Sequence, residues 1–389
     1  MQNLKRRTWA EIDLNCVEHN FDEIKNHCKT NICCVIKADA YGHGAVELAK
    51  EYEKLGASFF GVSNIDEALQ LRKADIRLPI LIFGYTPVTD APVLADNNIS
   101  QCVYSLEYAN QLSEECVKQN VIVKIHIKVD TGMSRLGFYY QNPKEDFETI
   151  DEIRKASKLY GLFPEGIFTH FASSDLKDNT FTLKQLCNFN LVLNSVKDIN
   201  FTLIHCANSG GTLDYENSRF DMVRAGIILY GLSPSDEVKN KLDLKPALSL
   251  KSVVSHVKKV KVGTSISYGR TFIADKDMII ATIAIGYADG YTRILSEKGA
   301  EVLVGGKRCK VVGRICMDQL MIDLNGDNSV KIGDIVTLIG SDLNETITAE
   351  EIANLRNTIN YEVICDIGAR VPRVYIKNNI EVAMLNYIG

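Results

Sequence analysis

The chain has 389 residues, of which 46% are hydrophobic and 24% charged, with a formal net charge of −5 and a pI near 5.9. This length allows two domains with a large core, and the acidic balance gives no electrostatic reason to expect binding to nucleic acid or to an anionic membrane. No apolar run approaches the length of a membrane span, and the start, MQNLKRRTWAEIDL, lacks the apolar stretch of a signal peptide. We therefore expect a cytoplasmic protein with neither nucleic-acid nor membrane partners.

The 11 cysteines are spread along the chain without the paired spacing of a metal site. Four of them, Cys33, Cys34, Cys187 and Cys206, lie in apolar runs. We expect these four to be small core residues in a reducing compartment, and we expect no metal ion.

From about residue 30 to 235, short apolar runs alternate with segments of helical period. The apolar runs are 33–37, 58–62, 79–83, 101–104, 122–128, 161–168, 202–206 and 224–230. The segments between them include GAVELAKEYEKLG, NIDEALQLRKA, SLEYANQLSEECVKQ and NPKEDFETIDEIRKASK. About eight β-then-α units over this length predict an α/β fold with a (β/α)8 barrel of the TIM type, although alternation alone also fits a doubly wound open sheet.

Two of the predicted helices in this region carry start signals. Asn64 and Ser105 are suitable N-cap residues, because their side chains can accept hydrogen bonds from the first helical amides. Glu67, three residues after Asn64, predicts a capping box at that helix.

The pattern changes past residue 245. The runs SVVSHVKKVKVG, DMIIATIAIGY, EVLVGGKRCKVVG and VKIGDIVTLIG are short β segments broken by Gly and Asp turns. One helix is predicted in TAEEIANLRNTIN, with Thr348 as its cap and Glu351 three residues later. We predict a barrel over residues 10–240 and a mostly β C-terminal domain over residues 241–389, which also takes in the first few N-terminal residues.

Polar residues cluster where the predicted barrel strands end, which is where barrel enzymes place their active sites. Lys37, after the run CCVI, could extend its ammonium to water or could be a nucleophilic amine in a half-buried pocket. Taken alone, His170 could be a core histidine and Arg224 a structural ion-pair partner. The residues that would converge on the barrel mouth are Lys37, Tyr41, Arg135, His170, Asn208, Ser209 and Arg224.

Around these positions the sequence resembles the alanine racemase family of pyridoxal phosphate (PLP) enzymes. The segment VIKADAYGHG resembles the family signature at the cofactor lysine. The resemblance continues in order through DTGMSRLGF, THFASSD, HCANSGG, RAGIILYG, SISYGRTF, IGYADGY, GRICMDQ and YEVICDIGARVPR, up to residue 373. It implies a PLP-binding barrel followed by a β domain.

The resemblance assigns roles in cofactor binding. Lys37 would hold PLP as a Schiff base, Arg135 would hold its phenolic oxygen, and Arg224 would face its pyridine nitrogen. Lys128 matches a position that is carbamylated in some members. The other implied cofactor contacts are Tyr41, Asn208, Ser209 and Tyr230, with backbone groups of Gly226 and Ile227.

The resemblance also implies a two-base racemisation of L- and D-alanine, which supplies D-alanine for peptidoglycan. Lys37 would serve one face of the substrate and Tyr268 of the partner subunit the other, in a homodimer whose subunits both contribute to each site. Because an ordinary tyrosine is a weak base at neutral pH, Tyr268 would be tuned through a hydrogen-bonded string with His170 and Arg224. The implied substrate contacts are Arg135, Met317, Tyr287 and Tyr361, and the outer corridor is Asp175, Arg293 and Arg314.

The residue type at Arg224 affects the chemistry that the resemblance implies, and Gly368 departs from the family's usual residue. Arginine only donates hydrogen bonds, so Arg224 would make PLP a weak electron sink and favour reprotonation over transamination. At Gly368 the family more often has serine or a larger residue.

Three alternatives to an alanine racemase stay open. They are a racemase of another small amino acid such as serine or of broad specificity, a barrel-type PLP decarboxylase, and a non-enzymatic PLP carrier of the single-barrel type.

Overall fold

The computed structural model describes residues 6–388, so the first five residues, which were predicted to join the β domain, lie outside the described part. The chain forms two compact units. The barrel unit comprises Glu18–Ala40 and Ala45–Lys245, and the β unit comprises Met1–Val17, Tyr41–Gly44 and Pro246–Gly389.

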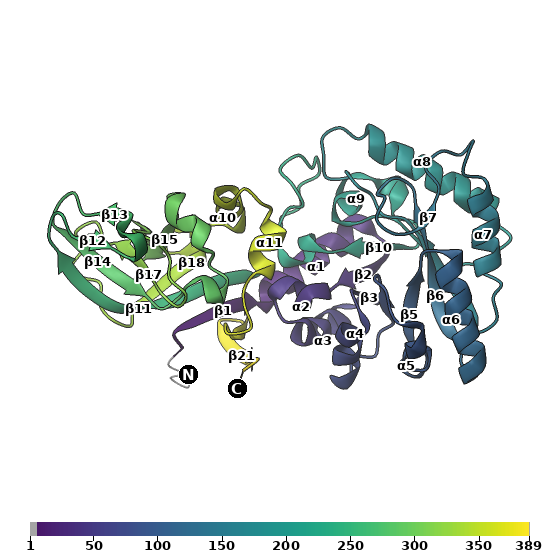
Figure 1. Cartoon of the computed structure of the whole chain (residues 1–389), viewed down its shortest axis with the longest axis horizontal. Coiled ribbons are helices and arrows are strands. Elements are labelled where there is room, and N and C mark those ends of the chain that lie inside the picture. Colours follow the sequence, from purple (N-terminus) through teal and green to yellow (C-terminus); the bar gives the residue numbers. More distant parts are fainter. Residues whose placement is uncertain (1–5, 389) are drawn as a thin grey trace. The chain divides into compact units, whose positions relative to one another are not determined.

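Parallel strands form the barrel (Figure 1). They are β2 (Asn31–Val35), β3 (Phe59–Val62), β4 (Ile80–Ile82), β5 (Ile99–Val103), β6 (Val123–Asp130), β8 (Leu162–Phe168), β9 (Leu203–His205) and β10 (Met222–Ala225). Their order is β10-β2-β3-β4-β5-β6-β8-β9, and the short β7 (Phe138–Tyr139) pairs with β6. Backbone bonds from Asp221 N to Ile204 O (3.0 Å) and from Arg224 N to Ala207 O (2.9 Å) join the two ends of this order. The nearly closed sheet confirms the barrel prediction over the open doubly wound sheet.

Helices surround these strands. They are α1 (Leu14–Cys28), α3 (Ala45–Leu55), α4 (Ile65–Lys73), α5 (Ala91–Asp96), α6 (Leu106–Gln119), α7 (Glu148–Ala156), α8 (Thr180–Ser195) and α9 (Ser209–Asp214). Helix α6 shows how the sequence sets their limits. The Ser105 hydroxyl accepts a bond from Tyr108 N, and Asn120 ends the helix in the left-handed conformation. Asn64 caps α4 in the same way, so both predicted N-caps are confirmed.

The predicted capping box at α4 is wrong. Glu67 does not bond back to the Asn64 amide, because its carboxylate accepts from Ser63 N (2.7 Å) and Ala38 N (2.8 Å). The side chain therefore ties the start of α4 to the segment after β2.

The cysteines of the described residues are all free. Cys33, Cys34 and Cys206 are buried as predicted, and burial raises the pKa of Cys33 to about 12. Cys187 is exposed, so the prediction that it is a core residue is wrong. Cys187 lies on α8, and the polar and apolar residues of this helix did not show which of its faces is buried.

Antiparallel strands dominate the β unit. The long strand β11 (Leu248–Val260) pairs with β1 (Thr8–Asp13), β14 (Met278–Ile283) and β18 (Ile335–Asp342). The remaining strands are β12 (Ser265–Ile266), β13 (Phe272–Ile273), β15 (Glu301–Val304), β16 (Lys307–Lys310), β17 (Leu320–Asp323), β19 (Glu345–Ile347), β20 (Arg373–Lys377) and β21 (Ile380–Leu385). Helix α10 (Ala349–Arg356) is capped by Thr348, as predicted, and α11 (Asn360–Cys365) follows it.

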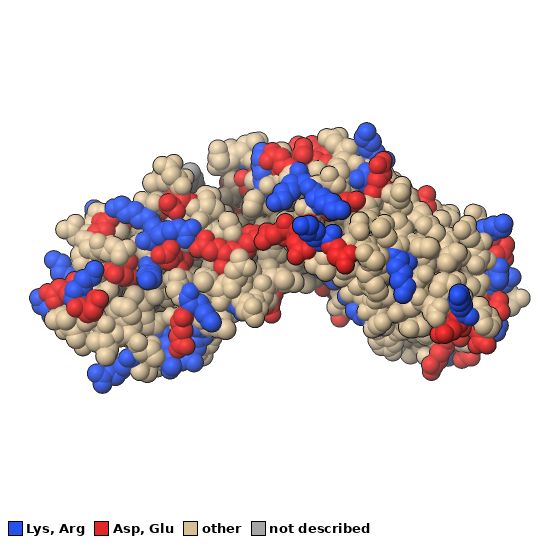
Figure 2. Space-filling view, turned by 90° about the horizontal axis from the view of Figure 1, so that it is seen from above, with Lys and Arg blue, Asp and Glu red and all other residues tan. Residues whose placement is uncertain are grey.

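The surface carries both signs of charge. On the face shown in Figure 2, the Lys and Arg side chains are intermixed with Asp and Glu and form no separate basic area. Within residues 6–388, no helix is both long and apolar enough to cross a membrane.

Gly42 offers a test of the fold. Its φ is +81°, and an added Cβ would lie 2.2 Å from Ile364 O, whereas Gly326 has φ +83° and open space around it. We expect Gly326→Ala to lower the free energy of unfolding by about 1–2 kcal/mol through backbone strain alone. Gly42→Ala should lower it by more than about 3 kcal/mol, because the clash is added to the strain. Urea unfolding monitored by circular dichroism measures both, and equal losses would contradict the packing described at Gly42.

Candidate active site

The segment after β2 turns with the opposite hand to an ordinary helix. Lys37 begins helix α2 (Lys37–Gly42), in which residues 38–41 have φ between 50° and 54° and Gly42 has φ 81°. A left-handed turn costs L-residues roughly 1–2 kcal/mol each, so neighbouring groups must hold it in place. The sequence predicted only a loop here, because alanine, aspartate and tyrosine carry no signal for this conformation.

Two carboxylates hold this turn. Glu67 accepts from Ala38 N at 2.8 Å, and Asp39 accepts from Ala45 N at 2.8 Å. The first of these bonds fixes the residue next to Lys37. The backbone that carries the Lys37 amine is therefore fixed on both sides, by strand β2 before it and by Glu67 after it.

Several cationic groups gather at the carboxyl ends of the barrel strands. His170 follows β8, Lys128 lies near the end of β6, Arg135 is in the loop after β6, and Arg224 is in β10. Burial lowers the pKa of His170 well below its ordinary value, and the charges of Arg224, Lys128, Arg135 and Lys37 lower it further. The structure thus brings these predicted residues together around a neutral His170.

Arg224 is 3% exposed, and three of the four N–H groups on its terminal nitrogens have acceptors within the barrel. Nη1 donates to His205 Nδ1 at 2.8 Å. Nη2 donates to the carbonyls of Thr169 (2.8 Å) and Cys206 (2.9 Å) and lies 3.3 Å from His170 Nδ1. Burial lowers the pKa of Arg224 to about 10, so the side chain stays charged at neutral pH. Its Nε–H and the second N–H of Nη1 have no acceptor among the described residues, and Nε–H is a donor available to a ligand.

Lys128 is buried near Arg224 and His170. Its Nζ donates to Val129 O at 3.0 Å and lies 5.4 Å from the centre of the Phe168 ring. Burial lowers its pKa to about 7, and the positive charges of Arg224 and Arg135 act in the same direction. Loss of the lysine proton near neutral pH thus removes the repulsion between Lys128 and the Arg135 and Arg224 charges.

Backbone donors gather after β9 and β10. Asn208 caps α9 by accepting from Gly211 N (2.9 Å) and Ser174 Oγ (2.7 Å). The Ser209 hydroxyl accepts from Gly226 N at 3.0 Å, which joins the start of α9 to the start of the 3-10 helix after β10. The first amides of both helices have no intrahelical acceptor. This donor-rich position fits the phosphate of PLP, and Arg224 Nε fits a ring nitrogen.

Tyr230 does not fit its predicted phosphate contact. It is fully buried in the 3-10 helix Ile227–Tyr230, and its hydroxyl donates to Val35 O at 2.8 Å. With that proton used, the hydroxyl has none left to donate to a phosphate. Tyr230 instead ties this helix to strand β2, two residues before Lys37.

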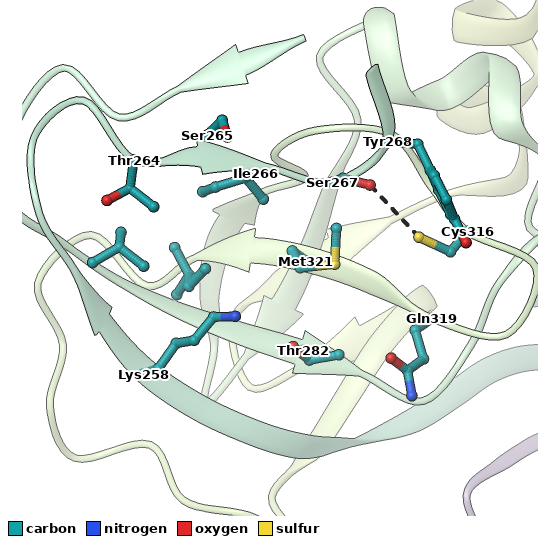
Figure 3. A pocket seen from close by; sticks show the side chains of 12 residues that line it. Lys258, Thr264, Ser265, Ile266, Ser267, Tyr268, Thr282, Cys316, Gln319 and Met321 are labelled. Carbon is teal, nitrogen blue, oxygen red and sulfur yellow. Dashed lines mark hydrogen bonds between the residues drawn. The ribbon is translucent and has the colours of Figure 1, made fainter. Parts of the chain in front are cut away.

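In the β unit, Tyr268 projects from a short turn between β12 and β13 and is 67% exposed. Ser267, with φ 66°, donates its hydroxyl to Arg314 O at 2.5 Å and contacts Cys316 Sγ at 3.5 Å. Figure 3 shows Tyr268 and Cys316 at one end of a pocket of about 420 Å³, with Lys258 at its other side. The phenol is thus presented on a fixed turn rather than packed as a strand tyrosine.

The other predicted residues of the β unit lie on two further loops. Tyr287 N donates to Cys316 O (3.1 Å) and Ala288 N to Met317 O (3.0 Å), so the loops of Tyr287 and Met317 pack backbone to backbone. The ring of Tyr361, on α11, lies 6.0 Å from that of Tyr41. Burial raises the pKa of Tyr41, which keeps its hydroxyl protonated as a donor.

Sequence reasoning missed three polar residues inside the barrel. His205 contacts Arg224 directly, and His126 and Glu165 lie behind it. His205 stands in the quoted segment HCANSGG, and a carboxylate in the apolar run LFPEGIF was the available signal for Glu165.

Comparison with known proteins identifies the family. The model described as "Alanine racemase, N-terminal domain" matches residues 12–234, and the one described as "Alanine racemase, C-terminal domain" matches residues 247–375. The chain belongs to the alanine racemase family. The family's members are PLP-dependent racemases.

Individual relatives extend over the whole chain. The alanine racemase of Clostridium tetani is 47% identical over 98% of this chain and 99% of its own length. The solved alanine racemase of Clostridium difficile is 43% identical, with a TM-score of 0.93 and 99% of each chain covered. A solved histidine racemase from Leuconostoc mesenteroides is 31% identical, with a TM-score of 0.86 over 96% of this chain and 99% of that one.

Lys128 gives a pH-dependent test. Its folded pKa of about 7 lies below the ordinary lysine value of roughly 10.4. The cost of burying its charge is therefore complete below pH 7 and fades as the pH rises toward 10. We expect Lys128→Met to raise the free energy of unfolding by a few kcal/mol at or below pH 7, with a smaller gain at higher pH.

Urea titrations of the unmodified and variant proteins over this pH range measure the difference. Lys118→Met serves as a control, because the Lys118 side chain is 68% exposed and pairs with Glu115 on the same helix. A gain from Lys128→Met that does not change with pH would contradict the lowered pKa.

Proposed function

We propose that this protein is an alanine racemase that interconverts L- and D-alanine with PLP. The observation that carries the proposal is Arg224, a buried guanidinium whose terminal nitrogens are held by the barrel while its Nε–H stays available to a ligand. It lies among His170, Lys128 and Lys37 in a chain whose full length matches alanine racemases.

The barrel would hold the cofactor through groups at its strand ends. Lys37 would bind the aldehyde carbon, Arg135 the phenolic oxygen and Arg224 Nε the ring nitrogen. The phosphate would be held by Tyr41, the Ser209 hydroxyl and Ile227 N, while Gly226 N, which donates to that hydroxyl, holds it in place and Asn208 fixes the start of α9. PLP, when bound, accepts the electron pair released when the Cα proton of an amino acid is removed.

Arg224 favours racemisation by being unable to give up a proton to the ligand. A carboxylic acid in its place could protonate a ring nitrogen and strengthen the electron sink. A guanidinium offers only a hydrogen bond, so the proton at Cα is returned quickly. Fast return of the proton to Cα distinguishes a racemase from enzymes that carry out transamination.

Two bases would act on opposite faces of the substrate Cα. The Lys37 amine would take or return the proton on one face, and the partner subunit's Tyr268 on the other. His170, kept neutral by burial and by Arg224, can accept a hydrogen bond or donate one to that phenol. Arg135 and the backbone N–H of the partner subunit's Met317 would hold the substrate carboxylate, while Tyr287 and Tyr361 would limit the side chain to a small one.

Several wider assignments belong to the same proposal. The exposed position of Tyr268 on its turn supports a homodimer in which each subunit completes the other's site. We place the functional barrel at residues 10–240 and the β domain at residues 241–389. We also propose a cytoplasmic location and a role in supplying D-alanine for peptidoglycan.

Variants of the two bases test the proposal. With PLP, the protein should be yellow and should racemise both alanine enantiomers, as followed by chiral chromatography. Lys37→Ala should lose both the colour and the activity. Tyr268→Phe should keep the colour and lose about 10²- to 10⁴-fold in rate, the usual contribution of a general acid or base.

Tyr160→Phe is the matched control, because Tyr160 is a surface tyrosine of the barrel that is 84% exposed. Mixing the two inactive variants tests the shared site. A mixed dimer holds one site with both an intact Lys37 and an intact partner tyrosine, so activity should reappear. Full activity of Tyr268→Phe alone would refute the two-base assignment.

Substrate breadth separates alanine racemase from the alternative, a racemase of serine or of broad specificity. The contact between Tyr361 and Tyr41 supports a small pocket, whereas the histidine racemase shows that a related chain serves a larger substrate. We expect kcat/KM for alanine to exceed that for serine, lysine and histidine by about tenfold or more. A panel of L-amino acids measures this, and equal values for serine or lysine would favour the alternative.

A further inference from the structure

A line of hydrogen-bonded side chains runs through the barrel from Arg224 toward the opposite end of the strands. Arg224 Nη1 is 2.8 Å from His205 Nδ1, and His205 Nε2 is 2.9 Å from His126 Nδ1. His126 Nε2 is 3.1 Å from Glu165 Oε2, which also accepts from Ser100 Oγ at 2.5 Å. The line thus joins the site to a carboxylate that none of the assigned roles uses.

The donor at one end, Arg224, and the acceptor at the other, the Glu165 carboxylate, fix the protons along this line. An arginine can only donate, so His205 Nδ1 must accept and its proton must be on Nε2. His126 Nδ1 must then accept, which puts its proton on Nε2, facing the carboxylate. If His126 carried a second proton, His205 would be forced to turn a donor toward Arg224. Both imidazoles are therefore neutral, with one tautomer each.

The barrel is shaped around these rings. His126 and His205 are fully buried, and the His205 ring stacks on Phe168 with centroids 4.7 Å apart. A Cβ on Gly166 would lie 2.5 Å from His126 Nδ1, so only glycine leaves room for this ring.

The charges agree with the geometry. Burial lowers the pKa of His126 and of His205, which keeps both neutral. Burial alone would raise the pKa of Glu165, but the bonds from His126 and Ser100 outweigh it and lower the pKa to about 2. The line therefore has a cation at one end and an anion at the other. Over residues 6–388, no group of three or more His, Cys, Asp or Glu is arranged to hold a metal ion, so these residues are not a metal site.

We propose that Glu165 is a positioning residue for the pyridine end of the site. Through His126 and His205 its carboxylate fixes the hydrogen-bond direction along the line, and so holds the Arg224 guanidinium in one orientation with Nε left for the ligand. The proposal rests on the proposed function only for the identity of that ligand. The direction of the hydrogen bonds from Arg224 to Glu165 does not depend on a bound ligand.

The direction can be measured without any activity. In protein labelled with ¹⁵N-histidine, His126 and His205 should both show an unprotonated Nδ1 and a protonated Nε2. These signals should not titrate between about pH 5 and pH 8, where an exposed histidine would. A doubly protonated His126, or the opposite tautomer at His205, would overturn the proposal.

Two substitutions at Glu165 separate its role as acceptor from mere space filling. Glu165→Gln keeps an acceptor oxygen for His126, whereas Glu165→Leu removes it and leaves a buried N–H without a partner. The Leu variant should show mixed His205 tautomers. It should also bind PLP about tenfold more weakly and lose about 10- to 100-fold in kcat, as when outer partners of a bound group are removed. The Gln variant should retain the tautomers and most of the affinity.

Lys124→Met is the control, since Lys124 lies 3.3 Å from the other oxygen, Oε1, and is outside the line. It should leave the tautomers, the PLP affinity and kcat unchanged. Thermal unfolding shows whether each variant is folded. If the Leu variant is not, the ¹⁵N-histidine tautomers of the unmodified protein still decide the proposal. Equal His205 tautomers and PLP affinity in the unmodified and Leu proteins would refute the role of Glu165. A correct tautomer pattern in a protein without racemase activity would refute the proposed function instead.

Discussion

Burying a guanidinium costs several kcal/mol unless its donors are hydrogen-bonded, and in this barrel Arg224 is almost completely buried. Its neighbours meet that requirement in two ways. Carbonyls of Thr169 and Cys206 accept directly, and His205 accepts through Nδ1, in the tautomer that its bond to His126 also supports. The same positive charge helps to keep His170 neutral and acts with burial on Lys128. Burial, with this positive charge acting in the same direction, thus lowers the pKa of both strand-end residues.

Both proposed bases lie beside left-handed backbone. Lys37 precedes residues 38–41, and Tyr268 stands between Ser267 (φ 66°) and Gly269 (φ 72°). Such conformations persist only where the surroundings determine them, and here Glu67 and the Ser267 hydroxyl supply bonds to the backbone. In each unit the reactive side chain therefore leaves the chain in a direction that an ordinary helix or strand could not give.

The sequence predicted the features that are local. Apolar runs located seven of the eight barrel strands to within two residues, because a buried parallel strand is a continuous apolar segment. The last run, 224–230, overlaps the end of β10 and mostly covers the 3-10 helix Ile227–Tyr230. Asn64, Ser105 and Thr348 were recognised as caps because a cap acts on amides two or three residues away. Glu67 was misread, since its partner Ala38 is 29 residues away and no spacing rule covers that contact. His126 and Glu165 were missed for the same reason, because only the closed barrel brings them into line with Arg224. Tyr230 was assigned from its motif alone, and its contact with Val35 depends on the fold.

The reversed turn after Lys37 has a consequence for how the protein matures. A mirror-image turn of alanine, aspartate and tyrosine is unstable in isolation, so it can persist only once Glu67 on α4 is in place. The orientation of the lysine amine is then acquired with the surrounding barrel rather than with its own segment. A chain in which α4 has not packed against the barrel therefore lacks the carboxylate that fixes the turn carrying Lys37.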